Sequence, residues 1–320
     1  MGAGRLAFNK VVFLGVSESS LSRENWAKLD ALVSKRVMLK PGDPQLKSEL
    51  ADADCIVNGF GVQVDKQLID AAPKLKYIGV FATAFNFVDT EYAKSKGITV
   101  CNVAGYSTEA VAEFVFGTLL EYLRDLEGSK KLGREGVNDY NGVFGGELKG
   151  KVFGIFGLGS IGSRVAEIAL GFGADVRYWS RNRKPAFEAK GVRYEPIDSL
   201  IPKCDVLTFH FSHNPETKNF MSRERMQKVK KGAILVKMIS IEAFDVAALE
   251  ERLSKGDVAF IFEYEEETPK EVFQRLSKYK TCMIYPSNAY ATNESMERRQ
   301  TILISNIKNY LDGHPINKVN

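Results

Sequence analysis

The sequence predicts an α/β protein with two domains, each built around a parallel sheet. Short strands and helices alternate over the first hundred residues, and a strand, glycine turn, helix and second strand occupy residues 151–184. Strands and helices alternate again from there to residue 311. This alternation is typical of parallel sheets covered by helices. A length of 320 residues is sufficient for two domains with substantial cores.

In the first hundred residues each expected element is a short apolar run or a run with helical spacing. The expected strands cover 10–16, 54–58, 77–81 and 98–103, and the expected helices cover 22–34, 65–73 and 89–97. A long helix over 110–126 follows, with an apolar face that includes Val111, Val115, Leu119 and Tyr122. We expect this helix to pack between domains or against another subunit. Residues 128–150 are polar and glycine-rich, which predicts a surface connection.

The second half repeats the alternation. Strands are expected over 152–156, 175–179, 204–209, 233–238, 258–262 and 281–284, and helices over 223–229 and 246–254. The last helix, over 295–311, is expected to return to the first domain.

A glycine turn lies at the centre of the predicted function. Gly157, Gly159 and Gly162 have the spacing G-x-G-x-x-G directly after an apolar strand and at the start of a helix. Such glycines permit a sharp turn, a close approach of a pyrophosphate to the backbone, and close packing of helix on strand. The free N–H groups at the helix start, near Ser160 and Ile161, would meet the phosphates. The alternative is a tight α/β turn without a ligand.

The residues after the second strand indicate which dinucleotide is bound. NAD-selective sites place Asp or Glu there to bind the ribose hydroxyls. This sequence has Ser180, followed by Arg181, Asn182, Arg183 and Lys184. A hydroxyl and guanidinium groups would bind a 2′-phosphate that a carboxylate would repel, so we expect NADP rather than NAD. The alternative is that these cations belong to a solvated loop.

Composition excludes several other classes. The chain is 44% hydrophobic and 26% charged, as in ordinary globular proteins, and its net charge of +4 is spread along the sequence. So small and dispersed a net charge does not form the basic patch that a nucleic-acid interface needs. Four widely spaced cysteines without C-x-x-C predict reduced thiols, with no metal site. No apolar run approaches the roughly 20 residues that cross a bilayer, so we expect a cytoplasmic protein.

Several motifs, in order, resemble those of the D-isomer-specific 2-hydroxyacid dehydrogenase family over nearly the whole chain. They are IDAAPKLKYIGV from Ile69, NVAGYSTEAVAE from Asn102, ELKGKVFGIFGLGSIG from Glu147, HNPETKNF from His213, KKGAIL from Lys230 and ALEERLSKGDV from Ala248. Within the family, the ending YWSRNRK is similar to that of NADP-preferring glyoxylate and hydroxypyruvate reductases.

The resemblance implies two domains, Rossmann-like and flavodoxin-like, with the active site and a small-molecule ligand in the cleft between them. The substrate domain would comprise residues 1–104 and 287–320, and the dinucleotide domain residues 105–286. It also implies a homodimer formed through the long helix, and adds Thr108 and His210 to the expected cofactor contacts.

The family's chemistry uses an arginine that grips the substrate carboxylate and a histidine that transfers the hydroxyl proton. By resemblance, Ser240 occupies the arginine position and Ser287 the histidine position. Nearby titratable groups that could take over are Lys237, Glu263, Tyr264 and Tyr290. For Lys237 the alternative is a structural lysine paired with a nearby carboxylate.

Three hypotheses remain. The chain is an NADP-dependent oxidoreductase for a substrate that needs no arginine clamp, or a nucleotide-binding sensor or scaffold without turnover. The third is an ordinary glyoxylate or hydroxypyruvate reductase whose catalytic residues lie elsewhere in the sequence.

Overall fold

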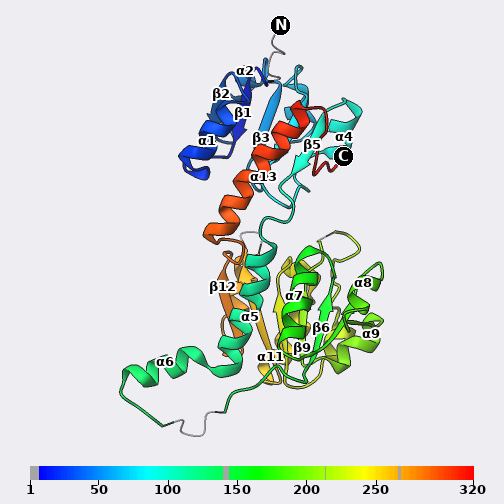
Figure 1. Cartoon of the computed structure of the whole chain (residues 1–320). Helices are drawn as coiled ribbons and strands as arrows, with labels where there is room; N and C mark the ends of the chain where they lie inside the picture. The colour runs from blue at the N-terminus through cyan, green and yellow to red at the C-terminus, as the bar shows by residue number, and fades with distance from the viewer. Residues whose placement is uncertain (1–6, 140–143, 213, 266–267) are drawn as a thin grey trace. The chain divides into compact units, whose positions relative to one another are not determined.

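The computed structural model describes residues 7–139, 144–212, 214–265 and 268–320, and the chain forms two compact units. Unit 1 contains residues 1–107 and 292–320, and unit 2 contains residues 108–291 (Figure 1). The predicted α/β class with parallel sheets is confirmed. The assignment of substrate binding to the first domain stays a prediction. Among the described residues, no helix has the length and apolarity needed to cross a membrane.

Unit 1 has a five-stranded parallel sheet in the order β2-β1-β3-β4-β5. Its strands are β1 (Val11–Leu14), β2 (Arg36–Leu39), β3 (Cys55–Asn58), β4 (Tyr77–Val80) and β5 (Thr99–Asn102). Its helices are η1 (Glu18–Ser20), α1 (Arg23–Asp30), α2 (Leu46–Leu50), α3 (Lys66–Asp70), α4 (Thr90–Ser95) and α13 (Asn293–Leu311).

Strand β2 is absent from the sequence-based expectation. It lies at the edge of the sheet, and only Leu39 of its four residues is buried. Its apolar run, residues 37–39, is short and follows a charged residue, so it gives only a weak strand signal.

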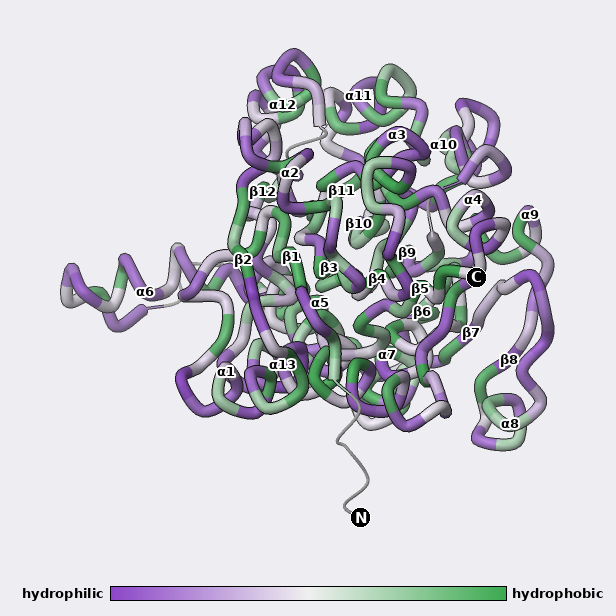
Figure 2. Tube along the Cα trace, turned by 90° about the horizontal axis from the view of Figure 1, so that it is seen from above, coloured by the Kyte–Doolittle hydropathy of each residue, from purple (hydrophilic) through white to green (hydrophobic). Residues whose placement is uncertain are grey.

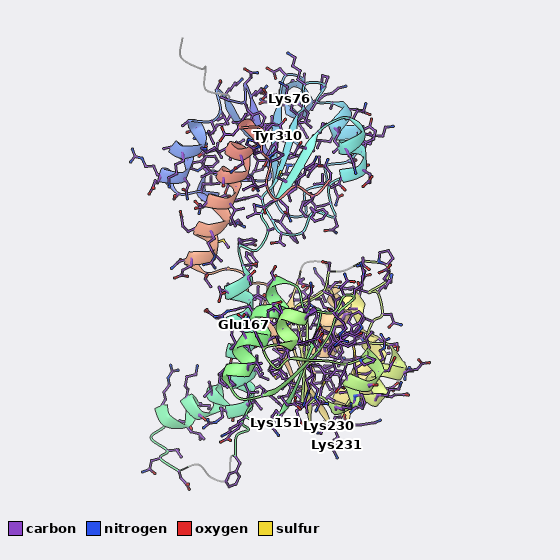
Figure 3. The ribbon with its side chains drawn as sticks, turned by 45° about the vertical axis from the view of Figure 1, so that its right-hand side comes forward. Lys76, Lys151, Glu167, Lys230, Lys231 and Tyr310 are labelled. Carbon is purple, nitrogen blue, oxygen red and sulfur yellow. The ribbon has the colours of Figure 1, made fainter. Side chains whose placement is uncertain are left out.

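The last helix completes the core of unit 1. Leu303 and Ile307 on α13 are fully buried among side chains of β1, β3 and β4. At its end, the Tyr310 hydroxyl donates to the carbonyl oxygen of Lys76 at 3.3 Å (Figure 3). Residues from both ends of the chain thus share one hydrophobic core.

Unit 2 has a seven-stranded parallel sheet in the order β12-β11-β10-β9-β6-β7-β8. Its strands are β6 (Val152–Phe156), β7 (Asp175–Trp179), β8 (Arg193–Tyr194), β9 (Val206–Phe209), β10 (Ala233–Lys237), β11 (Val258–Tyr264) and β12 (Cys282–Pro286). Its helices are α5 (Thr108–Arg124), α6 (Leu126–Arg134), α7 (Ser160–Gly171), α8 (Pro185–Glu188), α9 (Ile197–Leu200), η2 (Ile201–Lys203), α10 (Arg223–Lys228), η3 (Ile241–Ala243), α11 (Val246–Ser254) and α12 (Lys270–Leu276).

The expected surface connection over 128–150 needs a correction, because it begins inside helix α6. Asp125 separates α5 from α6 with a left-handed backbone at φ 44°, and its carboxylate accepts from the N–H of Gly128 at 3.3 Å. This side chain starts a new helix in a segment whose glycines predicted a loop. In Figure 2, α6 lies away from the sheet of unit 2 and carries both hydrophilic and hydrophobic residues.

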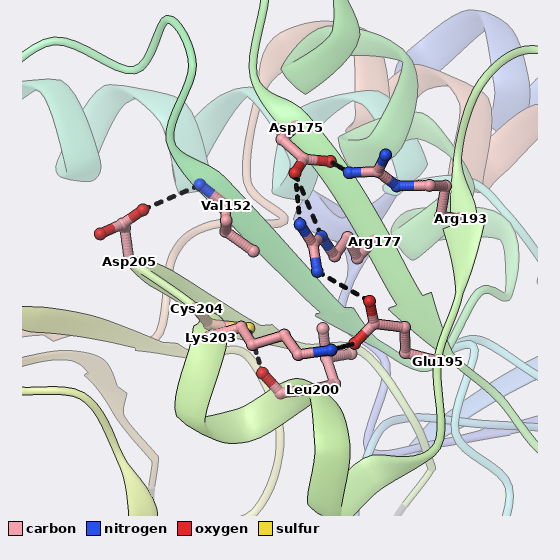
Figure 4. A network of polar contacts seen from close by, with 9 residues as sticks. All are labelled: Val152, Asp175, Arg177, Arg193, Glu195, Leu200, Lys203, Cys204 and Asp205. Atoms are coloured by element: carbon pink, nitrogen blue, oxygen red, sulfur yellow. Dashed lines mark hydrogen bonds and ion pairs between the residues drawn. The ribbon is translucent and has the colours of Figure 1, made fainter.

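Charged side chains link the last two strands, β7 and β8, at one edge of the sheet of unit 2. Arg177 of β7 donates to Asp175 at 2.6 Å and to Glu195 at 2.7 Å, and Arg193 of β8 also donates to Asp175 (Figure 4). Lys203 donates to Glu195 at 2.9 Å. Since these bonds link β7 to β8 and to η2, they hold the strand that leads into Ser180.

The carboxyl ends of the central strands lie level with one another. Phe156 of β6 pairs with Phe209 of β9, which pairs with Lys237 of β10 and, beyond it, Phe262 of β11. Ligands of open parallel sheets bind at this edge of the sheet. The residues that follow these strand ends are therefore the first place to look for a site.

Candidate nucleotide-binding site

The glycine turn joins β6 to helix α7 at the carboxyl edge of the sheet. Gly157 follows the strand with φ +98°, a region that L side chains rarely adopt, and its N–H donates to the carbonyl of Trp179 at 2.8 Å. Gly159 is the N-cap of α7. The strand, turn, helix and following strand predicted from sequence are all present.

Steric contacts give each glycine its own role. A Cβ on Gly162 would lie 2.0 Å from the carbonyl oxygen of Gly157, and a Cβ on Gly157 would lie 2.9 Å from the backbone of His210. Both glycines are therefore required by the protein itself. A Cβ on Gly159 would meet nothing within 4 Å. The space beside Gly159 is open at the start of a twelve-residue helix, which fits a pyrophosphate held by backbone N–H groups.

A surface pocket of about 490 Å³ lies next to this open position. It joins the start of α7 to the segment that follows β7. The residues lining it are Leu158, Gly159, Ser160, Ser163, Arg183, Lys184, Pro185, Ala186 and Phe187. Gly159, Ser160 and Arg183 were expected at the site. Ser163 and Lys184 were not, although Lys184 belongs to the same basic run and Ser163 lies one turn into the helix.

Arg183 is held by its neighbours. Its guanidinium donates through Nε to Glu188 at 3.0 Å and also through Nη2, and lies 5.2 Å from the ring centroid of Tyr194. The buried Tyr178 hydroxyl donates to Glu188 at 2.8 Å and accepts from the backbone N–H of Lys184 at 2.6 Å. The Arg183 side chain, which lines the pocket, is thus held in place by residues that do not line it.

The other expected residues of this loop do not line the pocket. The Ser180 hydroxyl is buried and donates to the carbonyl oxygen of Asn182, which closes the loop on itself. Arg181 forms an ion pair with Glu216 at 2.6 Å, and both side chains are exposed. Ile161 and Thr108 are half-buried at the first turns of α7 and α5.

His210 lies beside the glycine turn with unsatisfied hydrogen-bonding capacity. The residue follows β9, and both its ring nitrogens are enclosed without a partner among the described residues. Burial lowers the pKa of this imidazole to about 3, so the side chain is neutral at physiological pH. Buried polar atoms without partners are rare in proteins, and a bound ligand that reached them would satisfy them.

A second polar group, here called the carboxyl-edge cluster, consists of Lys237, Glu263 and Glu265. The fully buried Lys237 ammonium donates to the carbonyl of Glu263 at 3.2 Å and to the carboxylate of Glu265 at 3.1 Å. The Glu263 carboxylate accepts from the N–H of Ala289 at 2.7 Å. Burial raises the pKa of Glu263 above its usual range. These contacts match the structural alternative stated for Lys237.

The remaining candidates are Ser240, Ser287, Tyr264 and Tyr290. Ser240 accepts from the N–H of Glu242 at 3.3 Å at the start of η3, and Ser287 is exposed after β12. The Tyr264 ring packs against Phe273 with centroids 4.6 Å apart, and Tyr290 is 37% exposed. His213, where the HNPETKNF motif begins, lies outside the described residues. Among the described residues, no group of three or more His, Cys, Asp or Glu side chains could hold a metal.

A seven-stranded parallel sheet with a glycine turn between its first strand, β6, and helix α7 is that of a dinucleotide-binding protein. Comparison with known families gives the same result, because residues 116–289 match the model of the D-isomer specific 2-hydroxyacid dehydrogenase, NAD binding domain. The chain belongs to the D-isomer-specific 2-hydroxyacid dehydrogenase family of NAD(P)-dependent oxidoreductases, which act on CH–OH groups.

Relatives extend over nearly the whole chain. Hydroxypyruvate reductase of Blautia hydrogenotrophica is 30% identical over 310 residues, covering 92% of this chain and 95% of that protein. Glyoxylate reductase of Aeropyrum pernix is 32% identical over 285 residues, covering 86% and 85%. The TT0316 protein of Thermus thermophilus has a TM-score of 0.84 at 25% identity over 97% of this chain and 100% of that one. An acyclic imino acid reductase in complex with NADPH and D-Arg shares the fold, with a TM-score of 0.83 at 23% identity over 97% and 100%.

Proposed function

We propose that this chain is an NADPH-preferring reductase whose substrate does not require the family's arginine clamp. The observation that supports this most directly is the pocket of about 490 Å³ that joins the start of α7 to Arg183 and Lys184. A helix N-terminus favours the pyrophosphate, and two cations next to it favour a further phosphate on the adenosine ribose.

The cofactor preference follows from the residues at the end of β7. NAD-selective relatives of this fold place a carboxylate there, and this chain has Ser180. Glu188 is the carboxylate nearest to Arg183, but it is engaged by Arg183 and Tyr178 behind the pocket. The cations of the pocket are therefore available to a 2′-phosphate that NADH lacks.

The choice of substrate follows from Ser240 and Ser287. At the family's arginine and histidine positions, a serine supplies neither a permanent cation for a carboxylate nor a proton donor that titrates near neutral pH. A positioned proton donor contributes on the order of 10² to 10⁴ in rate. A ketoacid would have neither an arginine to bind its carboxylate nor a histidine to supply the proton, so we propose a carbonyl substrate without a carboxylate. When bound, NADPH supplies the hydride, and the chain's residues described above hold its phosphates.

The second candidate is a nucleotide-binding sensor or scaffold without turnover. The carboxyl-edge cluster favours it, because the contacts of Lys237 and Glu263 serve the strand ends and the loop at Ala289. Groups engaged in this way are less available to transfer a proton.

Two measurements test the function. Fluorescence titration with NADPH and NADH should give tighter binding of NADPH, and equal affinities would refute the cofactor preference. NADPH oxidation should then be screened with glyoxylate, hydroxypyruvate and a panel of aldehydes. Turnover of aldehydes alone supports the proposal, absence of turnover on all of them supports the sensor, and fast turnover of a ketoacid indicates an ordinary reductase.

We also propose that the chain forms a homodimer through α5 and α6. None of the residues of α6 is buried within the chain, and Leu126 is 43% exposed. Helices that bury no face in their own chain gain stability from a partner. Light scattering should give twice the mass of one chain, and Leu126→Glu should shift the equilibrium toward the monomer. A monomeric wild-type protein would refute this.

A further inference from the structure

We infer that Glu188, held by Tyr178, is a positioning residue that sets the cofactor specificity by presenting Arg183 to the pocket. This inference deepens the proposed NADPH preference and rests on it. The cofactor specificity then depends on the Glu188 carboxylate, whose charge alone would repel a bound phosphate.

The contact between Arg183 and Glu188 uses only one side of the guanidinium. Nε and Nη2 donate to the two carboxylate oxygens, which leaves Nη1 outside this contact. A bidentate pair of this kind fixes the plane of the guanidinium as well as its position. The Tyr194 ring, 5.2 Å from the guanidinium carbon, limits its movement further. Donors are left over for a ligand in the pocket.

Glu188 is itself held from the core. Tyr178 is fully buried in β7, and its hydroxyl donates to Glu188 at 2.8 Å. The same hydroxyl accepts from the N–H of Lys184 at 2.6 Å, so one phenol orients both the carboxylate and the backbone of the second cation. Hydrogen bonds from Arg183 and then from Tyr178 lower the pKa of Glu188, which keeps it ionised. In Figure 2, β7, β8 and α8 lie together at one edge of unit 2.

The Arg183 side chain is 64% exposed, so without these contacts it would be flexible. An arginine loses much rotamer freedom when it is ordered on a ligand, which weakens binding. A protein that orders the side chain in advance avoids most of that loss. Two effects of Glu188 on a 2′-phosphate therefore compete, since its charge repels the phosphate while its hydrogen bonds place Arg183. The bidentate geometry and the supporting phenol favour placement as the larger effect.

The test isolates the contribution of the 2′-phosphate to the binding affinity. Adenosine 2′,5′-bisphosphate and 5′-AMP differ only in that group, and calorimetric titration of the full chain gives both affinities. We expect Glu188→Ala to weaken the bisphosphate about tenfold, which corresponds to about 1.4 kcal/mol, and to change 5′-AMP less than about twofold. Glu188→Gln keeps an oxygen that accepts from Arg183, so it should retain most of the affinity.

Tyr178→Phe is the second variant, and it should weaken the bisphosphate selectively while leaving 5′-AMP bound. The 5′-AMP affinity of each variant shows that the pocket is folded. Unchanged or tighter bisphosphate binding by Glu188→Ala would overturn the inference, because repulsion would then dominate. Equal wild-type affinities for the two nucleotides would refute the NADPH preference, and the inference with it.

Discussion

The carbonyl oxygen of Gly157 lies where a side chain on Gly162 would begin. A Cβ at residue 162 would be 2.0 Å from that oxygen, far inside van der Waals contact, and no flexible side chain is available to give way. The close approach of helix α7 to strand β6 thus depends on the absence of a side chain at one position. The neighbouring Gly159, at φ −82°, has no such restriction.

This difference predicts opposite outcomes for two alanine variants. Gly162→Ala should lower the free energy of unfolding by about 3 kcal/mol, because helix and strand must separate. Gly159→Ala should cost less than about 1 kcal/mol, since its Cβ meets only open space, yet weaken NADPH at least about tenfold. Urea unfolding and NADPH titration separate the two effects. Equal stability losses would contradict the steric argument.

Arg183 and Arg181 provide a matched pair for the phosphate site. Arg183 lines the pocket, whereas Arg181 pairs with the exposed Glu216 outside it. Arg183→Ala should therefore reduce the preference for NADPH over NADH by about tenfold or more, the effect of losing a charge-assisted contact. Arg181→Ala should change it about twofold or less. A larger effect of Arg181→Ala would mean that the loop after β7 rearranges when the nucleotide binds.

His210 predicts a loss of stability in mild acid. Its pKa is about 3 in the folded protein, and about 6.5 is usual for a histidine in an unfolded chain. As the pH falls through that window, the unfolded state takes up a proton that the folded state does not bind. Stability is therefore complete above pH 6.5 and falls toward pH 3, by about 2 kcal/mol at pH 5.

The neutral variant His210→Gln should remove this contribution. Urea unfolding at pH 7.5 and pH 5 should show a smaller acid loss for His210→Gln than for the wild type. His314→Gln, at an exposed position of unit 1, is the control and should keep the wild-type pH dependence. Identical slopes for the two variants would contradict the burial argument.

The carboxyl-edge cluster predicts a cost for losing Lys237. Lys237→Met keeps most of the apolar side chain but removes the ammonium that bonds to the Glu263 carbonyl and the Glu265 carboxylate, so it should cost about 1–3 kcal/mol. Lys230→Met is the control, because Lys230 forms a half-exposed pair with Asp205 and its loss should cost less than about 1 kcal/mol. Equal losses in urea unfolding would show that burial adds nothing to the Lys237 contacts.

Local patterns were sufficient to predict most of the fold. Buried strands such as β6 and the glycine turn after it have signatures within a few residues, so their position could be read directly. Strand β2 and helix α6 could not, because the apolar run of β2 is only residues 37–39 and α6 begins at a capping side chain, Asp125, among helix-breaking glycines.

The sequence predicted only part of the site, because only some of the residues of the site have a local signature. The basic run after β7 identified Arg183, but only the folded chain separates it from Arg181, whose partner Glu216 is far along the sequence. Glu188 and Tyr178 were missed because their role depends on hydrogen bonds between a buried strand and a short helix. A carboxylate one turn after a basic run was the only signal, and many solvated loops share it.

The two segments of unit 1 flank unit 2 in the sequence, so unit 1 is completed only after unit 2 has been synthesised. Its core needs Leu303 and Ile307 of α13. The Asn320 side chain accepts from the N–H of Val100, on strand β5, and donates to the carbonyl oxygen of Ile98, just before that strand. Unit 2 is one continuous segment, so it can fold on the ribosome while residues 7–107 still lack helix α13. A chain released before residue 292 would therefore carry an intact nucleotide-binding unit joined to an exposed, aggregation-prone sheet.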